Sequence, residues 1–201
     1  MKKLLLLFLL TASFSTFAGS HLDFSLSDFC YKMPKVQDRG GIYYFPNEEV
    51  GITASSLCVY KGTYGQYQSK GKLKNGKKYG WWTYWHINGQ KWSEGNYKDG
   101  KEYGKWTRWH DSGNKLQELN RKDDKREGKW TWWFFNSTQK RSESNYKDDK
   151  LNGKDISWFE NGRIELEGNY INGKFDGKWT SWYENGQIES EKNYKDGRQV
   201  D

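Results

Sequence analysis

The chain has 201 residues and a formal net charge of +7, with 34% hydrophobic residues but 18% aromatic ones, including 12 Trp and 14 Tyr. Disordered chains are poor in aromatic residues, so this composition excludes a fully disordered protein. The basic residues are scattered among acidic ones, which excludes the clustered basic face that nucleic acid binding requires. Leu, Ile and Val are scarce after the first thirty residues, so we expect a thin structure with a mainly aromatic core.

Residues 1–19 have the pattern of a secretory signal peptide. Lys2 and Lys3 form a positive region, residues 4–10 form a short apolar run, and small residues follow. The apolar run is too short for a transmembrane helix, although an uncleaved membrane anchor is the alternative. Cleavage near Gly19 would lower the net charge from +7 to +5. The pattern predicts an exported protein, periplasmic or secreted, with no transmembrane segment after cleavage.

Residues 20–56 are predicted to form an N-terminal cap or extension. The chain has two cysteines, Cys30 and Cys58. Export favours a disulfide between them, which would contribute about 3–4 kcal/mol in the chain-entropy model. Two unpaired thiols are the alternative interpretation.

Residues 57–201 form an array of repeats with a period of about 24. Full units begin at five glycines: Gly80, Gly104, Gly128, Gly153 and Gly177. We number these units 1 to 5 and count positions from the glycine. The turn region at positions eight and nine reads Asn-Gly in three units, and a Glu and then an Asn follow it. The third unit has Asn136-Ser137 there and one extra residue, which predicts a longer loop.

Each unit is predicted to be a β-hairpin. Trp, Tyr, Thr and Phe favour strands, and Asn-Gly favours a two-residue type I′ turn. A second turn, with sequences such as Lys-Asp-Gly-Lys, leads to the next unit. The predicted fold class is therefore all-β: an elongated antiparallel meander of tandem hairpins in a single sheet.

Two aromatic columns follow from the alternation of side chains along a strand. The position-five tryptophans are invariant, so we expect them to be the better-buried structural ladder: Trp85, Trp109, Trp133, Trp158 and Trp182. Positions two and six share the other face and are predicted to form a partly exposed ladder that is the candidate binding surface: Trp82, Trp106, Trp130, Trp179, His86, His110, Phe134, Phe159 and Tyr183.

The repeat resembles the MORN family. It is most similar to the shorter MORN-variant repeat of bacterial proteins grouped as YwqK-type antitoxins. The matching pattern is Gly-x-Trp-x-x-Trp-aromatic-x-Asn-Gly followed by Glu-x-Asn-Tyr-x-Asp-Gly-Lys, and it covers about residues 57–198. The resemblance implies a β-hairpin array that serves as a protein-interaction or membrane-associated scaffold. Choline-binding or cell-wall-binding repeats, which are also Trp- and Tyr-rich hairpins, are the rival resemblance.

No catalytic motif occurs in the chain, so we expect neither an enzyme nor a cofactor. We also expect no metal site, because His86 and His110 would lie about 10 Å apart, two strands away from each other. The predicted function is an exported, non-enzymatic repeat scaffold that binds a protein or an envelope surface, either lipid or cell-wall polymer. The alternatives are a carbohydrate or cell-wall binding module, which would use exposed aromatic rings, and an antitoxin- or immunity-like protein that neutralises a toxin.

Overall fold

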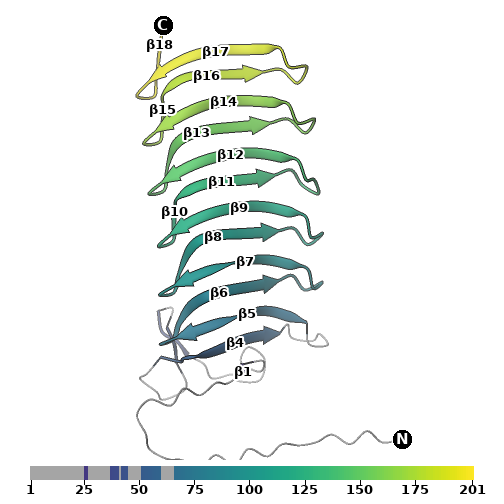
Figure 1. The fold of residues 1–201 in the computed structure, drawn as a ribbon, viewed down its shortest axis with the longest axis vertical. Helices are drawn as coiled ribbons and strands as arrows, with labels where there is room; N and C mark the ends of the chain where they lie inside the picture. The colour runs from purple at the N-terminus through teal and green to yellow at the C-terminus, as the bar shows by residue number, and fades with distance from the viewer. Residues whose placement is uncertain (1–24, 27–36, 41, 45–50, 60–65) are drawn as a thin grey trace, which may run out of the picture.

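The computed structural model describes residues 25–26, 37–40, 42–44, 51–59 and 66–201. They form a 16-stranded sheet and a separate two-stranded sheet, and this part of the chain contains no helix. Figure 1 shows that the hairpins of the large sheet stack in chain order along one axis and give an elongated molecule. The predicted all-β meander of tandem hairpins is confirmed.

Four short strands lie before the regular array. These strands are β1 (Ser25–Leu26), β2 (Gln37–Asp38), β3 (Tyr43–Tyr44) and β4 (Ala54–Val59). β1 pairs in parallel with β4 at the start of the large sheet, and β2 and β3 form the small sheet beside it.

Cys58 lies on β4, where it is buried and disulfide-bonded. Cys30, its predicted partner, lies outside the described residues, as does the predicted signal peptide at residues 1–19. The pairing of Cys30 with Cys58 therefore stays a prediction.

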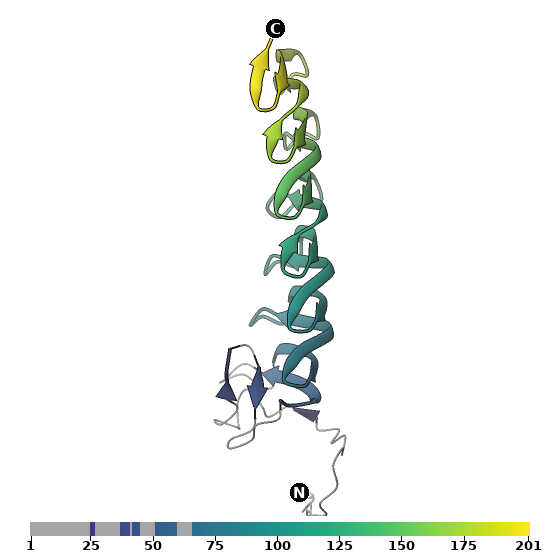
Figure 2. The same ribbon diagram turned by 90° about the vertical axis from the view of Figure 1, so that its left-hand side faces the viewer.

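The array itself is built mainly from strands of six to nine residues that pair antiparallel with their neighbours, and the two-residue strands β10 and β15 run in the same direction as β11 and β16. The strands are β5 (Tyr67–Lys74), β6 (Lys77–Trp85), β7 (Lys91–Lys98), β8 (Lys101–Trp109), β9 (Lys115–Lys122), β10 (Lys125–Arg126), β11 (Gly128–Trp133), β12 (Lys140–Lys147), β13 (Lys150–Trp158), β14 (Ile164–Ile171), β15 (Lys174–Phe175), β16 (Gly177–Trp182), β17 (Ile188–Lys195) and β18 (Arg198–Val200). Figure 2 shows the same stack from the side, with each unit curling about the long axis.

The two ends of each hairpin use different turns, and the type I′ turn predicted for the Asn-Gly end lies at the other end. At Asp99-Gly100, in the Lys-Asp-Gly-Lys segment, both central residues have positive φ, at 53° and 84°, as a type I′ turn requires. At Asn88-Gly89 only the glycine has positive φ, at 89°, and its N–H donates to the carbonyl of His86 at 3.0 Å. That end is a three-residue loop closed by a left-handed glycine, not the predicted two-residue type I′ turn.

The third unit has the longer loop that its sequence predicted. Its strands are separated by residues 134–139, whereas residues 110–114 separate the strands of the second unit. Asn136, with φ of 51°, takes the left-handed conformation that glycine provides in the other units.

The sheet has two chemically different faces. The core face carries the position-two tryptophans, which pair across strands with small or apolar residues, as Trp106 does with Gly95 and Leu119. The ion-pair face carries the glutamate column, in which Glu118 contacts Lys105 at 3.0 Å and Lys115 at 2.6 Å. The Lys105 pair joins β8 to β9, and cross-strand pairs of this kind each stabilise a sheet modestly.

Burial of the two tryptophan columns is the reverse of the prediction. The position-two residues Trp82, Trp106, Trp130 and Trp179 are buried, with Trp106 only 1% exposed. The position-five tryptophans, Trp85, Trp109, Trp133, Trp158 and Trp182, are only half-buried. They lie next to the loops on the ion-pair face, where Lys91 lies over Trp109 at 5.6 Å. The position-two column is therefore the core, and it cannot be the exposed ladder that we expected.

Glycine on the neighbouring strand lies beneath three of the four buried tryptophans, whereas Trp130 pairs with Ser144 and packs with Leu119. A Cβ atom added to Gly95 would lie 2.3 Å from the ring of Trp106, and Gly71 and Gly168 lie equally close beneath Trp82 and Trp179. The bare backbone lets each indole lie flat on the sheet. The indole N–H of Trp106 then donates to the carbonyl of Asn96 at 3.1 Å, so its polar group is satisfied inside the core.

Candidate binding groove on the core face

Position four determines whether the core face is filled or hollow near the three-residue loops. In units 1 to 3 the column carries large side chains, namely Tyr84, Arg108 and Trp132, whereas units 4 and 5 carry Ser157 and Ser181. Ser157 and Ser181 pair with the same residue, Leu166, so they lie on the same face as neighbours in the sheet. Replacing rings and a guanidinium by two hydroxymethyl groups leaves space that no other layer covers.

A groove occupies this space. Its central part has a volume of about 480 Å³ and is lined by Ser157, Phe159, Glu165, Leu166, Ser181, Trp182, Tyr183, Glu184 and Glu189. An adjoining hollow of about 810 Å³ shares part of that lining and extends to the loop of unit 3, at Phe134, Phe135 and Arg141. The groove therefore runs across the strands, parallel to the long axis of the array.

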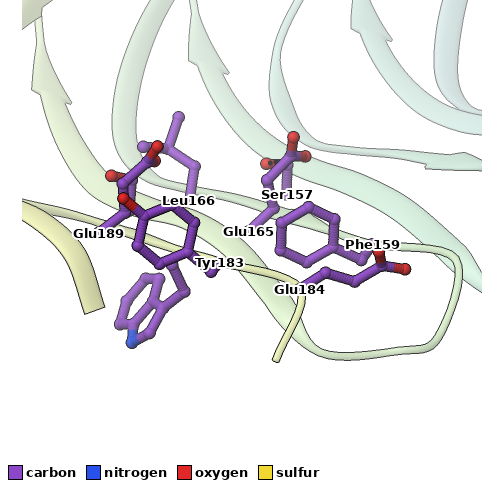
Figure 3. A pocket seen from close by; sticks show the side chains of 9 residues that line it. Ser157, Phe159, Glu165, Leu166, Tyr183, Glu184 and Glu189 are labelled. Atoms are coloured by element: carbon purple, nitrogen blue, oxygen red, sulfur yellow. Dashed lines mark hydrogen bonds between the residues drawn. The ribbon is translucent and has the colours of Figure 1, made fainter. Parts of the chain in front are cut away.

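Aromatic rings line the side of the groove that faces the loops. Position six supplies Phe134, Phe159 and Tyr183, one from each of units 3 to 5. Figure 3 shows Phe159 and Tyr183 as neighbouring rings with acidic side chains around them. Tyr183 is 51% exposed and Phe135 is 68% exposed, so these rings are available to a ligand. The predicted binding role of position six thus keeps a structural basis in units 3 to 5, whereas position two does not.

The groove is acidic. Glu165 and Glu189 are the extra residues of two β-bulges, one in β14 and one in β17. Glu160 and Glu184 directly follow the position-six rings. The carboxylate of Glu165 accepts a hydrogen bond from the Ser157 hydroxyl at 3.0 Å. Within the described part of the chain these four glutamates make no ion pair, and Arg141 is the single cationic side chain among the groove residues.

The same strands show paired glutamates on the opposite face. Glu167 on β14 contacts Lys154 at 2.8 Å, and Glu191 on β17 contacts Lys178 at 2.5 Å. The ion-pair face is thus neutralised within the chain, whereas the groove keeps an excess of negative charge. This contrast identifies the groove as the place where a cation from outside would gain most.

In the filled units, side chains of the protein itself occupy the space that is open in the groove. The Lys78 ammonium donates to the Tyr84 hydroxyl at 2.8 Å, and that hydroxyl donates to Tyr97 at 3.3 Å. Burial raises the pKa of Tyr84, and the nearby Tyr97 raises it further, so both hydroxyls stay neutral. Lys78 also lies 4.8 Å above the ring of Trp82. A cation held over aromatic rings is therefore already part of unit 1.

The buried column is interrupted in unit 4. Asp155 occupies the tryptophan position, and Ser144 occupies the position that is Gly95 in unit 1. The Ser144 hydroxyl donates to the Asp155 carboxylate. Burial raises the pKa of Asp155 above its ordinary value, although this hydrogen bond opposes the shift. The exchange of Trp and Gly for Asp and Ser is thus a matched pair that keeps the carboxylate hydrogen-bonded.

The two position-six histidines do not form a site together. The ring of His86 bonds the carbonyl of Trp109 at 3.1 Å, whereas His110 packs edge-on against Phe135 at 4.7 Å. No group of three His, Cys, Asp or Glu side chains that could hold a metal ion occurs among the described residues. The same residues include no helix that is long and apolar enough to cross a membrane.

Two segments of the array match a known repeat family. The profile of the MORN repeat variant matches residues 102–123 and 175–196, which lie at equivalent positions of units 2 and 5. These two segments are MORN repeat variants. No curated protein matches the chain. The MORN-variant segments each contain one complete hairpin, from the end of the type I′ turn region to the next such turn, which agrees with the unit defined by the strands.

The groove was not found from sequence reasoning, although a signal for it exists. Position four has no recurring residue type, since its residues are Tyr84, Arg108, Trp132, Ser157 and Ser181. That variability is the signal, since a change from large to small residues in a fixed structural column opens a hollow.

Proposed function

We propose that this protein is a non-enzymatic repeat scaffold that binds a partner protein in the groove on the core face of units 3 to 5. The observation that carries the proposal is the combination of Ser157 and Ser181, which open the groove, with glutamates that have no ion pair in the described chain. The sheet behind the groove is rigidly defined by consecutive pairing, as expected for a recognition surface built on a scaffold.

The chemistry of the groove favours a protein over the other partners that the sequence suggested. Phosphate groups of lipids and anionic cell-wall polymers would be repelled by its glutamates. Neutral sugars could stack on Phe159 and Tyr183, but they would leave the negative charge unpaired. A protein segment can supply both apolar contacts and basic side chains.

We further propose that the protein acts outside the cytoplasm, on the support of the signal-peptide pattern in residues 1–19. Sequencing the N-terminus of the protein purified from its own cells tests this point. A mature chain that begins near residue 19 or 20 is expected, and an intact Met1 in the mature protein would contradict it. The antitoxin-like role that the family resemblance implied is tested separately: a toxin gene beside this one, whose product the protein neutralises on co-expression, would support it.

Site-specific photocrosslinking tests the proposed groove. A photoreactive benzoylphenylalanine in place of Tyr183 should crosslink one partner in the protein's own cells, and the same group in place of His86 should not. The double variant Ser157→Trp and Ser181→Tyr, which copies the natural residues Trp132 and Tyr84, should abolish that crosslink while leaving the fold intact. An unchanged crosslink in the filled variant would refute the groove as the binding site.

A further inference from the structure

The groove repeats its chemistry with the period of the array. Glu165 on β14 and Glu189 on β17 occupy equivalent positions and are separated by two strand steps, as are Phe159 and Tyr183. With adjacent strands ~4.8 Å apart, equivalent groups recur about every 10 Å along the groove. From Phe134 in unit 3 to Tyr183 in unit 5 there are four steps, or about 19 Å.

A peptide that binds along this groove must present its side chains at the same interval. A β-strand repeats each face every two residues, or about 6.8 Å, which falls out of phase with the groove after one unit. A polyproline II helix has three residues per turn and a rise of ~3.1 Å, so it repeats about every 9.3 Å. It stays in phase with the glutamates of units 4 and 5 and with the rings of units 3 to 5.

The side-chain chemistry agrees with this geometry. In units 4 and 5 each period of the groove contains one ring and two glutamates, as in Phe159, Glu160 and Glu165, whereas the unit 3 end carries Phe134, Phe135 and Arg141. Aromatic-lined grooves are a general way to bind polyproline II segments, because the extended helix is pre-formed and its rings stack on aromatic side chains. The glutamates add a requirement for positive charge, and an ammonium group can also lie over a ring, as Lys78 does over Trp82 at 4.8 Å.

From these observations we infer that the partner segment is a polyproline II helix that carries Lys or Arg at every third residue, with at least two such residues in register with units 4 and 5. This inference rests on the proposed function and specifies its partner. About six residues of such a helix fill the 19 Å length.

The inference is tested with synthetic peptides of one composition and two orders. A fluorescent dodecapeptide of four Lys-Pro-Pro repeats should bind the full-length protein in an anisotropy titration at physiological salt. A peptide of the same composition with Lys at positions 1, 2, 8 and 9 has the same charge but no two lysines three residues apart, and it should bind at least about fivefold more weakly, because no two of its lysines can face Glu165 and Glu189 together. Equal binding of the two peptides would show attraction by charge alone and would overturn the inference.

Matched charge variants locate the bound peptide. Glu165→Gln with Glu189→Gln should weaken the periodic peptide about fivefold to tenfold, the range expected for two exposed ion pairs. Glu167→Gln with Glu191→Gln makes the same charge change on the same two strands but on the ion-pair face, and should leave binding within about twofold. A comparable loss in both double variants would overturn the inference.

The outcomes also separate this inference from the proposed function. If neither peptide binds but the photocrosslink from Tyr183 persists and is lost in the filled variant, the scaffold function stands and the polyproline II partner is wrong. If the crosslink is absent and the periodic peptide fails as well, both are wrong. Displacement of the bound peptide by spermidine at equal charge concentration would show that the site takes free polyamines, and would also count against a peptide partner.

Discussion

The filled and hollow parts of the core face are built from the same repeat but differ in one column. Units 1 to 3 place Tyr84, Arg108 and Trp132 over the sheet, whereas Ser157 and Ser181 leave the groove open in units 4 and 5. The charge differs as well. Glu102 in the filled part pairs with Arg121 at 2.7 Å, but the groove glutamates make no ion pair within the described residues. The comparison shows that a repeat scaffold can acquire a site by losing side chains from one column without changing its backbone.

The largest expected effect on the free energy of unfolding comes from removing a buried tryptophan, and it should differ between the filled and hollow parts. Trp106→Ala should lower the free energy of unfolding by about 3–5 kcal/mol, because its ring is fully enclosed by Tyr84, Tyr97 and Leu119. Trp179→Ala should cost less, about 2–3 kcal/mol, since Trp179 already lines a hollow of about 260 Å³. Urea denaturation measures both. Equal losses would mean that the hollow part is packed as tightly as the filled part.

A second prediction repairs the interruption at Asp155. The double variant Ser144→Gly with Asp155→Trp restores the pair that Gly95 and Trp106 form, and should raise the free energy of unfolding by about 1–2 kcal/mol through added apolar burial. Asp155→Trp alone should gain less, because the Ser144 side chain occupies the space beneath the ring. Denaturation of the three proteins side by side decides the point, and a single variant as stable as the double would argue against the need for a bare backbone.

A third prediction uses pH. Burial raises the pKa of Asp155, so the native state binds its proton more tightly than the unfolded chain does. Ionisation of Asp155 therefore costs stability at neutral pH, and the cost disappears as the pH falls below the ordinary range of an aspartate. Asp155→Asn should be more stable than wild type at pH 7, with a difference that shrinks as the pH falls towards 4.

Glu118, in the filled part, should behave in the opposite way. Burial alone would raise its pKa, but hydrogen bonds and charges from Lys115 and Lys105 outweigh this effect and lower it. Its stabilisation is present at neutral pH and is lost as the pH falls through the lowered pKa. Glu118→Gln should therefore be less stable than wild type at pH 7, with the difference vanishing in acid. A pH series of unfolding curves that gave both variants the same sign would contradict the assigned environments.

The smallest effect on stability is expected where the effect on binding is largest. Ser157→Trp should change the free energy of unfolding by less than about 0.5 kcal/mol, because unit 3 already accommodates Trp132 in that column. The reverse change, Trp132→Ser, should deepen the unit 3 end of the groove without unfolding the array. Anisotropy titration with the Lys-Pro-Pro peptide should show lost binding for Ser157→Trp, and retained or tighter binding for Trp132→Ser.

Much of the fold could be predicted from sequence because the same hairpin pattern occurs in five units. The period of 24, the strand-forming residues and the paired turns are enough to predict a meander. Two local features needed coordinates. Alternation along β6 puts Trp85 on the ion-pair face beside the loop, where its ring contacts Tyr67 at 5.6 Å and is only half-buried, so invariance at position five did not indicate full burial. The turn types depend on backbone φ values that Asn88-Gly89 and Asp99-Gly100 do not distinguish by sequence.

The candidate site was only partly predictable. Position six was identified from its aromatic residues, and Phe159 and Tyr183 do line the groove. The groove itself arises where side chains are small, and small side chains do not form a recognisable sequence motif. Glu165 and Glu189 were equally hidden, because they stand two residues before the regular glutamate column and reach the core face only through the bulge.

The backbone hydrogen bonds between successive type I′ turns carry one more implication. The N–H of Gly100 donates to the carbonyl of Lys78 at 3.0 Å, and the N–H of Gly197 donates to the carbonyl of Phe175 at 2.8 Å. Every such bond joins a unit only to its immediate neighbour, so inserting or deleting one whole unit would leave the remaining contacts in register. Duplication of a unit within the gene can therefore lengthen this molecule in steps of about 10 Å, so the number of repeats sets its length.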